Sequence, residues 1–311
     1  MKKRVLTLFL VLLISGSGCD SSGSSSSTPA DLAEGIRGAL RWCSEQATGT
    51  LGKANGFLLD KVCKILLPEP AQETLDYIKS STAAKTALNA AIEIAFLGTD
   101  IDDIDSFEDA VIKSMNTAAE EAVADTETYQ AFADVISSLS IDGTFDILRG
   151  TVPATSRAEG EEPVTETPYA ATIYLKEMTH DPLLTAFSDI IDPLFDQKLG
   201  RAAYRNRAGV SFSLNELWGY YKTAVSTYNA GAGFLYDEVD VPADTIGTHV
   251  TQKALDGLFY KVGEFELKMR DDYATLFDIA SDIYEAFKWA DENAPDGLTD
   301  LIESGLDYLL P

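Results

Sequence analysis

VTQKALDGLFYKVGEFELKMR, residues 250–270, is the stretch that decides the fold class. Its large apolar side chains recur at intervals of three and four residues: Leu255, Leu258, Phe259, Val262, Phe265 and Met269. That spacing places them on one face of a helix. The oppositely charged pairs Glu264/Lys268 and Glu266/Arg270, each four residues apart, support a helix on its flanks. The stretch therefore predicts a long amphipathic helix whose apolar face packs into a core.

Helical patterns continue on both sides of this stretch. Helix-start signals occur at three places: Ser106-Phe107-Glu108-Asp109, Asp181-Pro182 and Ser213-Leu214-Asn215-Glu216. In the two serine motifs, the hydroxyl is expected to accept a backbone amide while an acid follows three residues later. Asp181-Pro182 predicts a helix start with a first-turn proline, and Pro193 predicts a kink further on. Only residues 210–213 alternate as a strand does, and they abut a helix start. We therefore predict an all-α, multi-helix bundle-like domain.

The N-terminus has the three parts of an export signal: cationic residues 2–4, an apolar run over 5–14 and small residues over 15–18. Ten apolar residues rise about 15 Å as a helix, about half the thickness of the bilayer hydrocarbon, so the run does not predict a spanning helix. With Cys19 at the cut site, residues 1–18 resemble a bacterial lipoprotein signal peptide. The resemblance implies that Cys19 becomes the lipidated first residue. Such signals usually carry Leu where this chain has Gly16, so export without a lipid is the alternative.

The remaining chain divides into a tether, a domain and an extension. Residues 19–30 are rich in Ser and Gly, which predicts a flexible tether. Residues 31–287 predict one helical domain with an exposed loop at 151–168, and residues 288–311 predict a C-terminal helical extension. We expect an exported, periplasm-facing envelope protein that contacts the membrane through its N-terminal lipid. The choice between inner and outer membrane is left open.

The chain is strongly acidic, with 24 Lys and Arg against 50 Asp and Glu and a net charge of −26 at pH 7. Removal of residues 1–18 would take away three cations and no acid, which leaves −29. Such a field repels phosphate backbones and anionic headgroups. Nucleic acid is therefore excluded as a partner, and so is electrostatic docking on a membrane. The acidity itself is typical of solubility or a saline habitat, with cation binding as the alternative.

Two cysteines remain beside Cys19. Cys43 falls on an apolar stripe at helical spacing and is expected to point into the core. Export would place it and Cys63 in an oxidising compartment, where a disulfide persists. A Cys43–Cys63 bridge is possible, and two buried free thiols are the alternative.

Residues with catalytic or metal-binding potential are few. The two histidines, His180 and His249, lie in no H-E-x-x-H motif, and the chain has no C-x-x-C or G-x-S-x-G. The densest acidic cluster consists of Asp100, Asp102, Asp103, Asp105, Glu108 and Asp109. Its spacing does not fit an EF-hand loop, so we interpret it as an acid-rich helix entrance. No cofactor and no metal site is predicted.

An aromatic-rich stretch covers residues 212–236. At helical spacing most of its rings are expected to serve as core. The alternative is an apolar or sugar-binding groove. That alternative requires Trp218, Tyr221 and Tyr228 to be accessible.

Several segments together resemble domain-of-unknown-function family 4197, a group of exported bacterial proteins that are often lipoproteins. The segments are 36–40 (IRGAL), 51–58 (LGKANGFL), 65–70 (ILLPEP), 115–122 (MNTAAEEA) and 250–259 (VTQKALDGLF). The resemblance covers about residues 32–287, and its last segment is the most specific. It implies a helical, envelope-located domain. It implies no activity and no catalytic residue.

Two functions from different classes follow. The first is a non-enzymatic, lipid-anchored envelope protein with a binding or structural role. The second is an enzyme with a carboxylate-based or divalent-metal-assisted site, drawing on the Asp100–Asp109 cluster or on Asp256. Catalytic residues are not assigned by the sequence, because acid/base chemistry requires carboxylates whose pKa values are driven apart, and no motif marks such a pair.

Overall fold

The structure, a computed structural model, describes residues 28–153, 164–198, 204–205, 210–232, 246–276, 280–293 and 309. The predicted signal peptide, Cys19 and the predicted tether up to residue 27 lie outside these residues. So do residues 154–163 of the predicted loop and 294–308 of the predicted extension.

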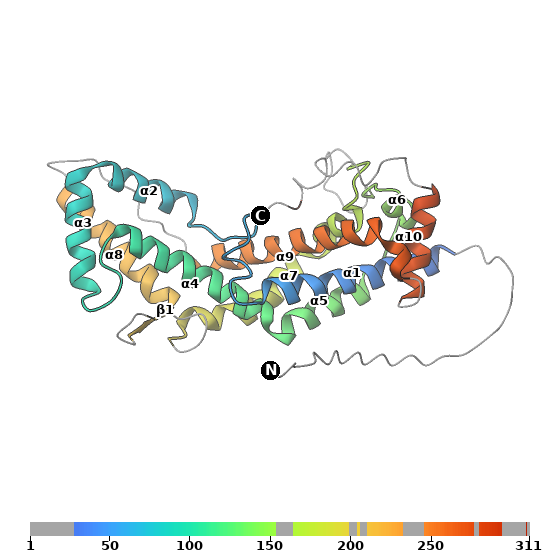
Figure 1. Cartoon of the computed structure of the whole chain (residues 1–311), viewed down its shortest axis with the longest axis horizontal. Coiled ribbons are helices and arrows are strands. Elements are labelled where there is room, and N and C mark those ends of the chain that lie inside the picture. The colour runs from blue at the N-terminus through green and yellow to red at the C-terminus, as the bar shows by residue number, and fades with distance from the viewer. Residues whose placement is uncertain are drawn as a thin grey trace, which may run out of the picture.

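The described chain folds almost entirely into helices, which confirms the all-α prediction. The arrangement is elongated (Figure 1). At one end four helices run alongside one another: α1 (Pro29–Leu51), α5 (Thr126–Ser138), α7 (Ala170–Ile191) and α9 (Ile246–Asp271). The short α6 (Thr144–Leu148) and α10 (Ser281–Asn293) close that end.

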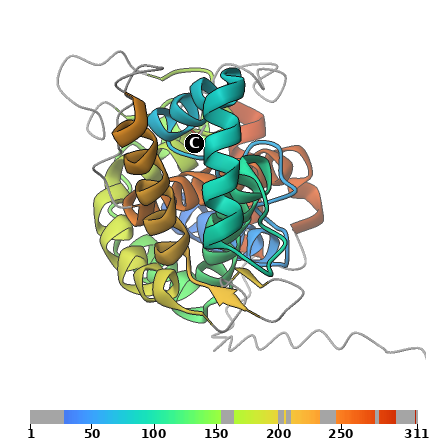
Figure 2. The same ribbon diagram turned by 90° about the vertical axis from the view of Figure 1, so that its left-hand side faces the viewer.

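The other end is built by α2 (Glu69–Ser80), α3 (Thr82–Ala95) and α8 (Leu214–Ala232). Figure 2 shows these helices in front when the molecule is viewed from that side. The long α4 (Ile104–Ala124) joins the two ends, because it contacts α3 and α8 as well as α1, α7 and α9. A 3-10 helix, η2 (Asp192–Asp196), follows α7, and another, η3 (Tyr273–Leu276), follows α9.

A two-residue strand, β1 (Tyr204–Arg205), pairs antiparallel with β2 (Ser211–Phe212). The alternation at residues 210–213 therefore finds a strand partner, although the sequence indicated only a neighbouring helix. The predicted cap directly after it is confirmed. Ser213 Oγ accepts the Glu216 N–H at 3.2 Å, and Glu216 Oε2 accepts the Ser213 N–H at 3.0 Å.

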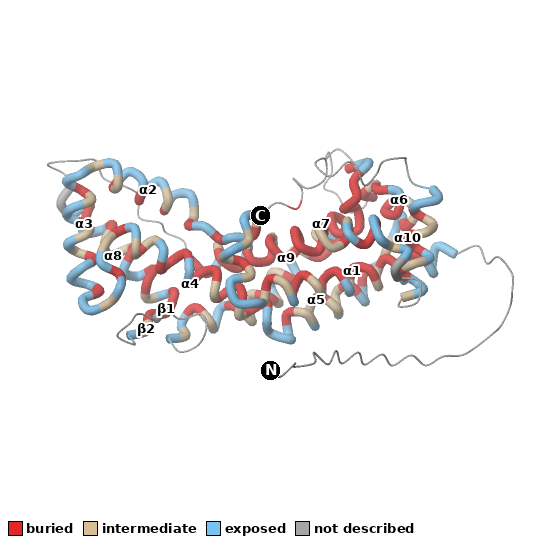
Figure 3. Tube along the Cα trace, in the orientation of Figure 1, coloured by how far each residue is buried: buried red, intermediate tan, exposed pale blue. Residues whose placement is uncertain are grey.

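The core of the first end lies around α9, which packs between α1 and α7. The predicted stripe is confirmed, with Leu255, Leu258, Phe259, Val262 and Met269 buried and Phe265 partly buried. Figure 3 shows buried residues running along α9 and along the facing side of α1. None of the described helices is both long enough and apolar enough to span a bilayer.

Two predicted helix starts are wrong. α7 does not begin at Asp181-Pro182 but at Ala170, and it continues through Pro182. Residues 170–175 are all buried, and their burial outweighs the roughly 3 kcal/mol that an internal proline costs. At Pro193, the predicted kink is instead the change from α7 to η2.

α4 begins at Ile104, earlier than the predicted start at Ser106. Its N-cap is Asp103, whose Oδ1 accepts the Ser106 N–H at 2.8 Å, while Ser106 Oγ accepts the Asp103 N–H at 3.0 Å. The helix starts early because Ile104 and Phe107 are both buried and must lie on its inner face.

Two predicted domain boundaries, after residues 30 and 287, lie inside helices. α1 begins at Pro29, with Thr28 as its cap, so the last residues of the predicted tether are helical. α10 crosses the predicted boundary between residues 287 and 288. Of the predicted extension beyond α10, the structure describes Leu309, whose side chain is buried.

Candidate functional site

The segment 52–68, called the connector below, joins α1 to α2 and is held by two buried side chains of α4. Asn116 Oδ1 accepts the Ile65 N–H at 2.9 Å, and Asn116 Nδ2 donates to the Ile65 carbonyl at 2.8 Å. Glu120 accepts the N–H groups of Asn55 at 2.9 Å and Leu58 at 3.4 Å. Asn55 itself has φ +62°, a left-handed conformation that asparagine tolerates.

α9 holds the connector from another side. Lys261 Nζ pairs with Asp60 at 2.6 Å and with Glu264 at 2.6 Å. His249 Nε2 lies 2.9 Å from the Leu66 carbonyl oxygen. Gly257 leaves room for the connector, since a Cβ there would lie 3.0 Å from Phe57 Cε1 and 3.4 Å from Cys63 Cβ.

The electrostatics between the connector and α9 favour the ionised forms of Asp60 and Lys261. Desolvation opposes ionisation of Asp60, but the Lys261 ammonium and the N–H groups of Cys63 and Val62 hold its pKa below the ordinary value. The carboxylates of Asp60 and Glu264 outweigh desolvation and raise the pKa of Lys261. Burial, reinforced by Asp60, raises the pKa of the Cys63 thiol to about 12. The pair Asp60–Lys261 is therefore ionised at neutral pH and the thiol is protonated.

Four of the segments that carry the resemblance to family 4197 meet here. Segments 51–58 and 65–70 supply the connector, segment 115–122 supplies Asn116 and Glu120, and segment 250–259 supplies Gly257. Their contacts are mostly backbone hydrogen bonds and close packing. Gly257 serves this packing, because the side chains of Phe57 and Cys63 approach its Cβ position.

Cys43 and Cys63 are both free and buried in the structure. Cys63 Sγ lies 3.6 Å from the Gly257 carbonyl oxygen. The thiol of Cys43 feels the charges of Glu266 and Arg270, which lie further along α9. Cys63 thus lies beside Gly257 and Cys43 lies near Glu266, nine positions further along α9. Nine positions correspond to a rise of about 14 Å. A disulfide needs its two Cα atoms within about 7 Å of each other. The structure therefore agrees with the alternative expectation, two buried free thiols, and not with a Cys43–Cys63 disulfide.

The flanking pair Glu266–Arg270 is buried, although the sequence placed it beside the apolar stripe as a surface pair. Arg270 Nη2 lies 2.7 Å from Glu266 Oε1. Glu266 also accepts the N–H groups of Ala171 and Thr172 at the start of α7, and Arg270 donates to the carbonyls of Ile147 and Leu148 at the end of α6. A carboxylate at a helix N-terminus and a guanidinium at a helix C-terminus both complement the helix dipole. The pair thus ties α9 to two other helices.

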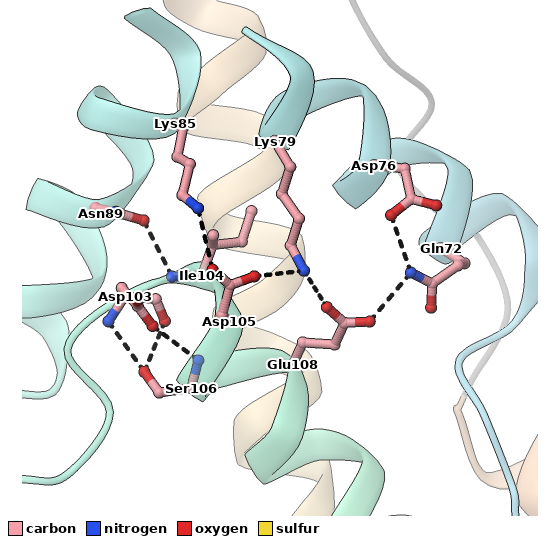
Figure 4. A network of polar contacts seen from close by, with 10 residues as sticks. All are labelled: Gln72, Asp76, Lys79, Lys85, Asn89, Asp103, Ile104, Asp105, Ser106 and Glu108. Carbon is pink, nitrogen blue, oxygen red and sulfur yellow. Dashed lines mark hydrogen bonds and ion pairs between the residues drawn. The ribbon is translucent and has the colours of Figure 1, made fainter. Parts of the chain in front are cut away.

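Two members of the acidic cluster, Asp105 and Glu108, take part in an ion-pair network between helices (Figure 4). Lys79 of α2 pairs with Glu108 and, at 2.8 Å, with Asp105 of α4. Lys85 of α3 reaches Asp105 at 3.0 Å. These two ammonium groups lower the pKa of Asp105. Asp103 serves as the N-cap of α4, as described above.

Neither the cluster nor Asp256 forms a metal site. Among the described residues, no group of three or more His, Cys, Asp or Glu side chains is arranged to hold a metal ion. Asp256 Oδ1 pairs with Lys176 Nζ at 3.0 Å. Asp103, Asp105, Glu108 and Asp256 thus have roles within the fold.

A polar surface cavity of about 340 Å³ lies where α7, η2, α8 and the start of α9 meet. We call it the polar cavity. Its lining is Leu184, Ser188, Asp192, Phe195, Asp196, Asn215, Gly247, Thr248, Thr251 and Gln252. The ring of Phe195 lies against Gly247, where a Cβ would be only 2.8 Å from Phe195 Cε2. Thr251 and Gln252 belong to segment 250–259, so the polar cavity borders the most specific part of the resemblance.

Two carboxylates give the polar cavity its charge. Partial desolvation, together with the negative charge of Asp189, raises the pKa of Asp192. Asp196 Oδ1 accepts a hydrogen bond from Asn215 Nδ2 at 2.8 Å. Sequence reasoning missed both residues because the lining comes from four separate elements and carries no motif.

The aromatic stretch divides between core and surface. Trp218, Tyr221 and Tyr228 are buried, so these three rings serve as core. Tyr220 is 38% exposed and lies 4.7 Å, centroid to centroid, from Phe96. Phe234 and Tyr236 lie outside the described residues. The groove alternative therefore fails for the three rings on which it depended.

Comparison with known proteins matches the chain to one family. The family described as "Protein of unknown function (DUF4197)" matches residues 26–279. No curated protein and no solved structure matches the chain. The family match covers well over half of the 311 residues and includes the connector, α4 and α9. The chain therefore belongs to the DUF4197 family of proteins of unknown function.

Proposed function

We propose that this protein is held at the cell envelope by a lipid on Cys19 and binds a small cationic ligand in the polar cavity, without catalysing a reaction. The observation that carries the binding role is the lining of the polar cavity, which combines two carboxylates with hydroxyl and amide groups and, among the described residues, contains no Lys, Arg or His. The envelope location rests on the N-terminal sequence alone.

The hydrogen-bonding capacity of the lining favours a ligand that donates. Ser188 Oγ already donates to the Leu184 carbonyl at 2.8 Å, and Thr251 Oγ1 donates to the Gly247 carbonyl at 2.9 Å. Each hydroxyl therefore presents lone pairs, and the carboxylates of Asp192 and Asp196 only accept. An ammonium or guanidinium group supplies both the donors and the positive charge that such a lining requires.

The remaining lining suits an alkyl part. Leu184 and the ring of Phe195 offer apolar contact beside the carboxylates. An alkyl amine carries methylenes next to its ammonium groups. Anionic ligands are opposed by the net charge of −26 for the whole chain. Small polyamines are therefore the probes of choice.

Isothermal titration calorimetry with putrescine and spermidine tests the binding role. We expect binding that weakens about tenfold or more in Asp192→Asn, because a charge-assisted hydrogen bond contributes about 1.5 to 3 kcal/mol. Asp181→Asn is the matched control, since it removes one exposed carboxylate from α7 outside the lining. Equal binding by both variants, or equal binding of glutamate, would contradict the proposal.

Acidification gives a second readout for the same site. Asp192 has a raised pKa, so it takes up a proton before an ordinary aspartate does. The affinity for spermidine should therefore fall as the pH is lowered toward that pKa. In Asp192→Asn this part of the pH dependence should be lost.

The anchor has its own test. Mass spectrometry of the protein purified from its native membrane should show an acyl-modified Cys19 as the first residue. Cys19→Ser should abolish both the modification and recovery in the membrane fraction. A native product that starts at Met1, or an unmodified Cys19 thiol, would contradict the proposed lipid anchor. Neither result would bear on the proposed binding in the polar cavity.

The raised pKa of Asp192 favours one alternative function, a carboxylate-based enzyme. A protonated Asp192 would provide a general acid in a cavity that holds a second carboxyl group, that of Asp196. Incubation of a bound amine with the protein, followed by mass spectrometry of the small molecule, separates the two functions. An unchanged ligand supports binding alone, and a product that disappears in Asp192→Asn supports the enzyme.

A further inference from the structure

A second cavity, of about 300 Å³, lies between the C-terminal end of α3, α4 and α8. We call it the apolar cavity. Most of its wall is formed by Ile92, Ile94, Phe96, Phe107, Tyr220 and Ala224. The ring of Phe96 is central, with centroids 5.6 Å from Phe107 and 4.7 Å from Tyr220. We propose that the apolar cavity binds the hydrocarbon chain of a lipid.

The described wall of the apolar cavity carries no charged side chain and disfavours charged ligands. Among the described residues, no Asp, Glu, Lys, Arg or His lines the apolar cavity, although the chain has 74 acidic and basic residues among 311. In this described lining, the side-chain hydroxyls other than that of Tyr220 belong to Thr223 and Thr227. Thr223 Oγ1 donates to the Gly219 carbonyl at 2.9 Å, and Thr227 Oγ1 donates to the Thr223 carbonyl at 2.8 Å. Both threonine hydroxyl hydrogens are thus used within α8.

The size of the apolar cavity favours a hydrocarbon chain over a helical protein segment as its ligand. A helix about 10 Å across needs about 120 Å³ per residue. A cavity of about 300 Å³ therefore holds less than one helical turn. An extended peptide would fit, but its N–H and C=O groups would lose water without gaining partners, which is costly. A methylene chain has no such groups.

The apolar surface also continues to the outside. Ile94, which lines the apolar cavity, is 79% exposed, and Leu97 just beyond α3 is 81% exposed. Exposed apolar surface next to a cavity marks binding sites in soluble proteins. A chain entering at this point would cover Ile94 before it reaches the rings. This proposal is independent of the polar cavity and of the anchor on Cys19.

Binding of cis-parinaric acid, whose fluorescence rises in apolar surroundings, tests the proposal on the full chain. We expect saturable binding at micromolar concentrations. Thr227→Asp should weaken it at least tenfold, because the substitution places a charge in the wall. The matched control is Ser226→Asp, which adds the same charge to the neighbouring exposed position of α8 and lines neither cavity. It should bind as the unmodified protein does.

A filling variant gives a second measurement. Ala224→Phe should occupy the apolar cavity and abolish binding, whereas Ala230→Phe, exposed on the same helix, should not. Circular dichroism shows whether each variant is folded, and the conclusion rests on Thr227→Asp if Ala224→Phe is not. No binding to the unmodified protein, or equal binding to Thr227→Asp and Ser226→Asp, would overturn the proposal.

Displacement of the probe distinguishes the source of the chain. Release by palmitate alone points to a free fatty acid, and release by a two-chain phospholipid as well points to a membrane lipid. Both results support a hydrocarbon ligand. Release by neither contradicts it.

Discussion

Asn116 of α4 holds both backbone groups of Ile65, with its Oδ1 2.9 Å from the Ile65 nitrogen and its Nδ2 2.8 Å from the Ile65 carbonyl oxygen. Asn116 and Ile65 are both buried. A single side chain thus replaces the pairing that a neighbouring strand or helix would give to this part of the connector. Without it, two buried polar groups would have to find other partners.

Asn116→Ala should destabilise the protein more than a typical substitution. Leaving a buried donor and a buried acceptor unsatisfied costs about 1 to 3 kcal/mol each, so we expect the free energy of unfolding to fall by about 2 to 6 kcal/mol. Urea denaturation followed by circular dichroism measures it. Gln130→Ala, which removes an exposed amide bonded to Asp134, should change the value by less than about 0.5 kcal/mol. Similar values for the two variants would disprove the assigned role.

The buried pair Glu266–Arg270 should show strong coupling. Arg270→Met leaves the Glu266 carboxylate buried without its partner, a change that costs about 3 to 5 kcal/mol. Adding Glu266→Gln removes the orphan charge while keeping an oxygen for the N–H groups of Ala171 and Thr172. The double variant should therefore be more stable than Arg270→Met alone. Additive losses in a double-mutant cycle would show that the two groups act separately.

Helical periodicity predicted most of the fold, whereas tertiary contacts decided the rest. The stripe Leu255–Met269 and the cap at Ser213 follow local rules, and both are confirmed. The start of α7 was missed because the burial of residues 170–175 overrides the signal of Pro182. The contacts of the connector could not be predicted, since Asn116 and Lys261 reach their partners across long sequence distances. The polar cavity could not be predicted either, because its lining comes from four separate elements.

The thiols of Cys43 and Cys63 should resist alkylation in the folded protein. Both are buried, and burial raises both pKa values, so little thiolate is present at neutral pH. Iodoacetamide should modify neither residue under native conditions and both after unfolding in urea without reductant. Peptide mapping by mass spectrometry measures the alkylation of Cys43 and of Cys63 separately from that of Cys19. A disulfide-linked peptide pair from the exported protein would show that the bridge forms after all.

The contact between His249 and Leu66 predicts a pH dependence near neutrality. Burial, opposed by the hydrogen bond to Leu66 and reinforced by Lys253, lowers the pKa of His249 below its ordinary value of 6.5. The unfolded chain then binds the proton more readily, so this contribution to stability is intact above about pH 6.5 and falls on acidification. His249→Gln should flatten the change in unfolding free energy between about pH 7.5 and 5.5. His180→Gln, the control, should retain it, because the Leu66 contact is preserved.

The close approach of α1 and α10 depends on Gly35. A Cβ at this position would lie 2.5 Å from the Asp282 carbonyl oxygen and 2.6 Å from Ala286 Cβ, so α10 would have to move away. Gly35→Ala should therefore lower the free energy of unfolding by about 1 to 3 kcal/mol, despite the helix propensity of alanine. Gly219→Ala is the matched control, because Gly219 lies within α8 with nothing near its Cβ position.

Gly219→Ala should raise the free energy of unfolding by about 0.5 to 1 kcal/mol, so the two glycine variants are expected to differ in sign. Hydrogen exchange adds a local readout. In Gly35→Ala the amides of α10 should lose protection first, because this helix is held mainly by α1, η3 and α6. The structure places the Asp282 carbonyl oxygen of α10 only 2.5 Å from the Cβ position of Gly35. If Gly35→Ala instead stabilises the protein as Gly219→Ala does, this close packing of α10 on α1 is contradicted.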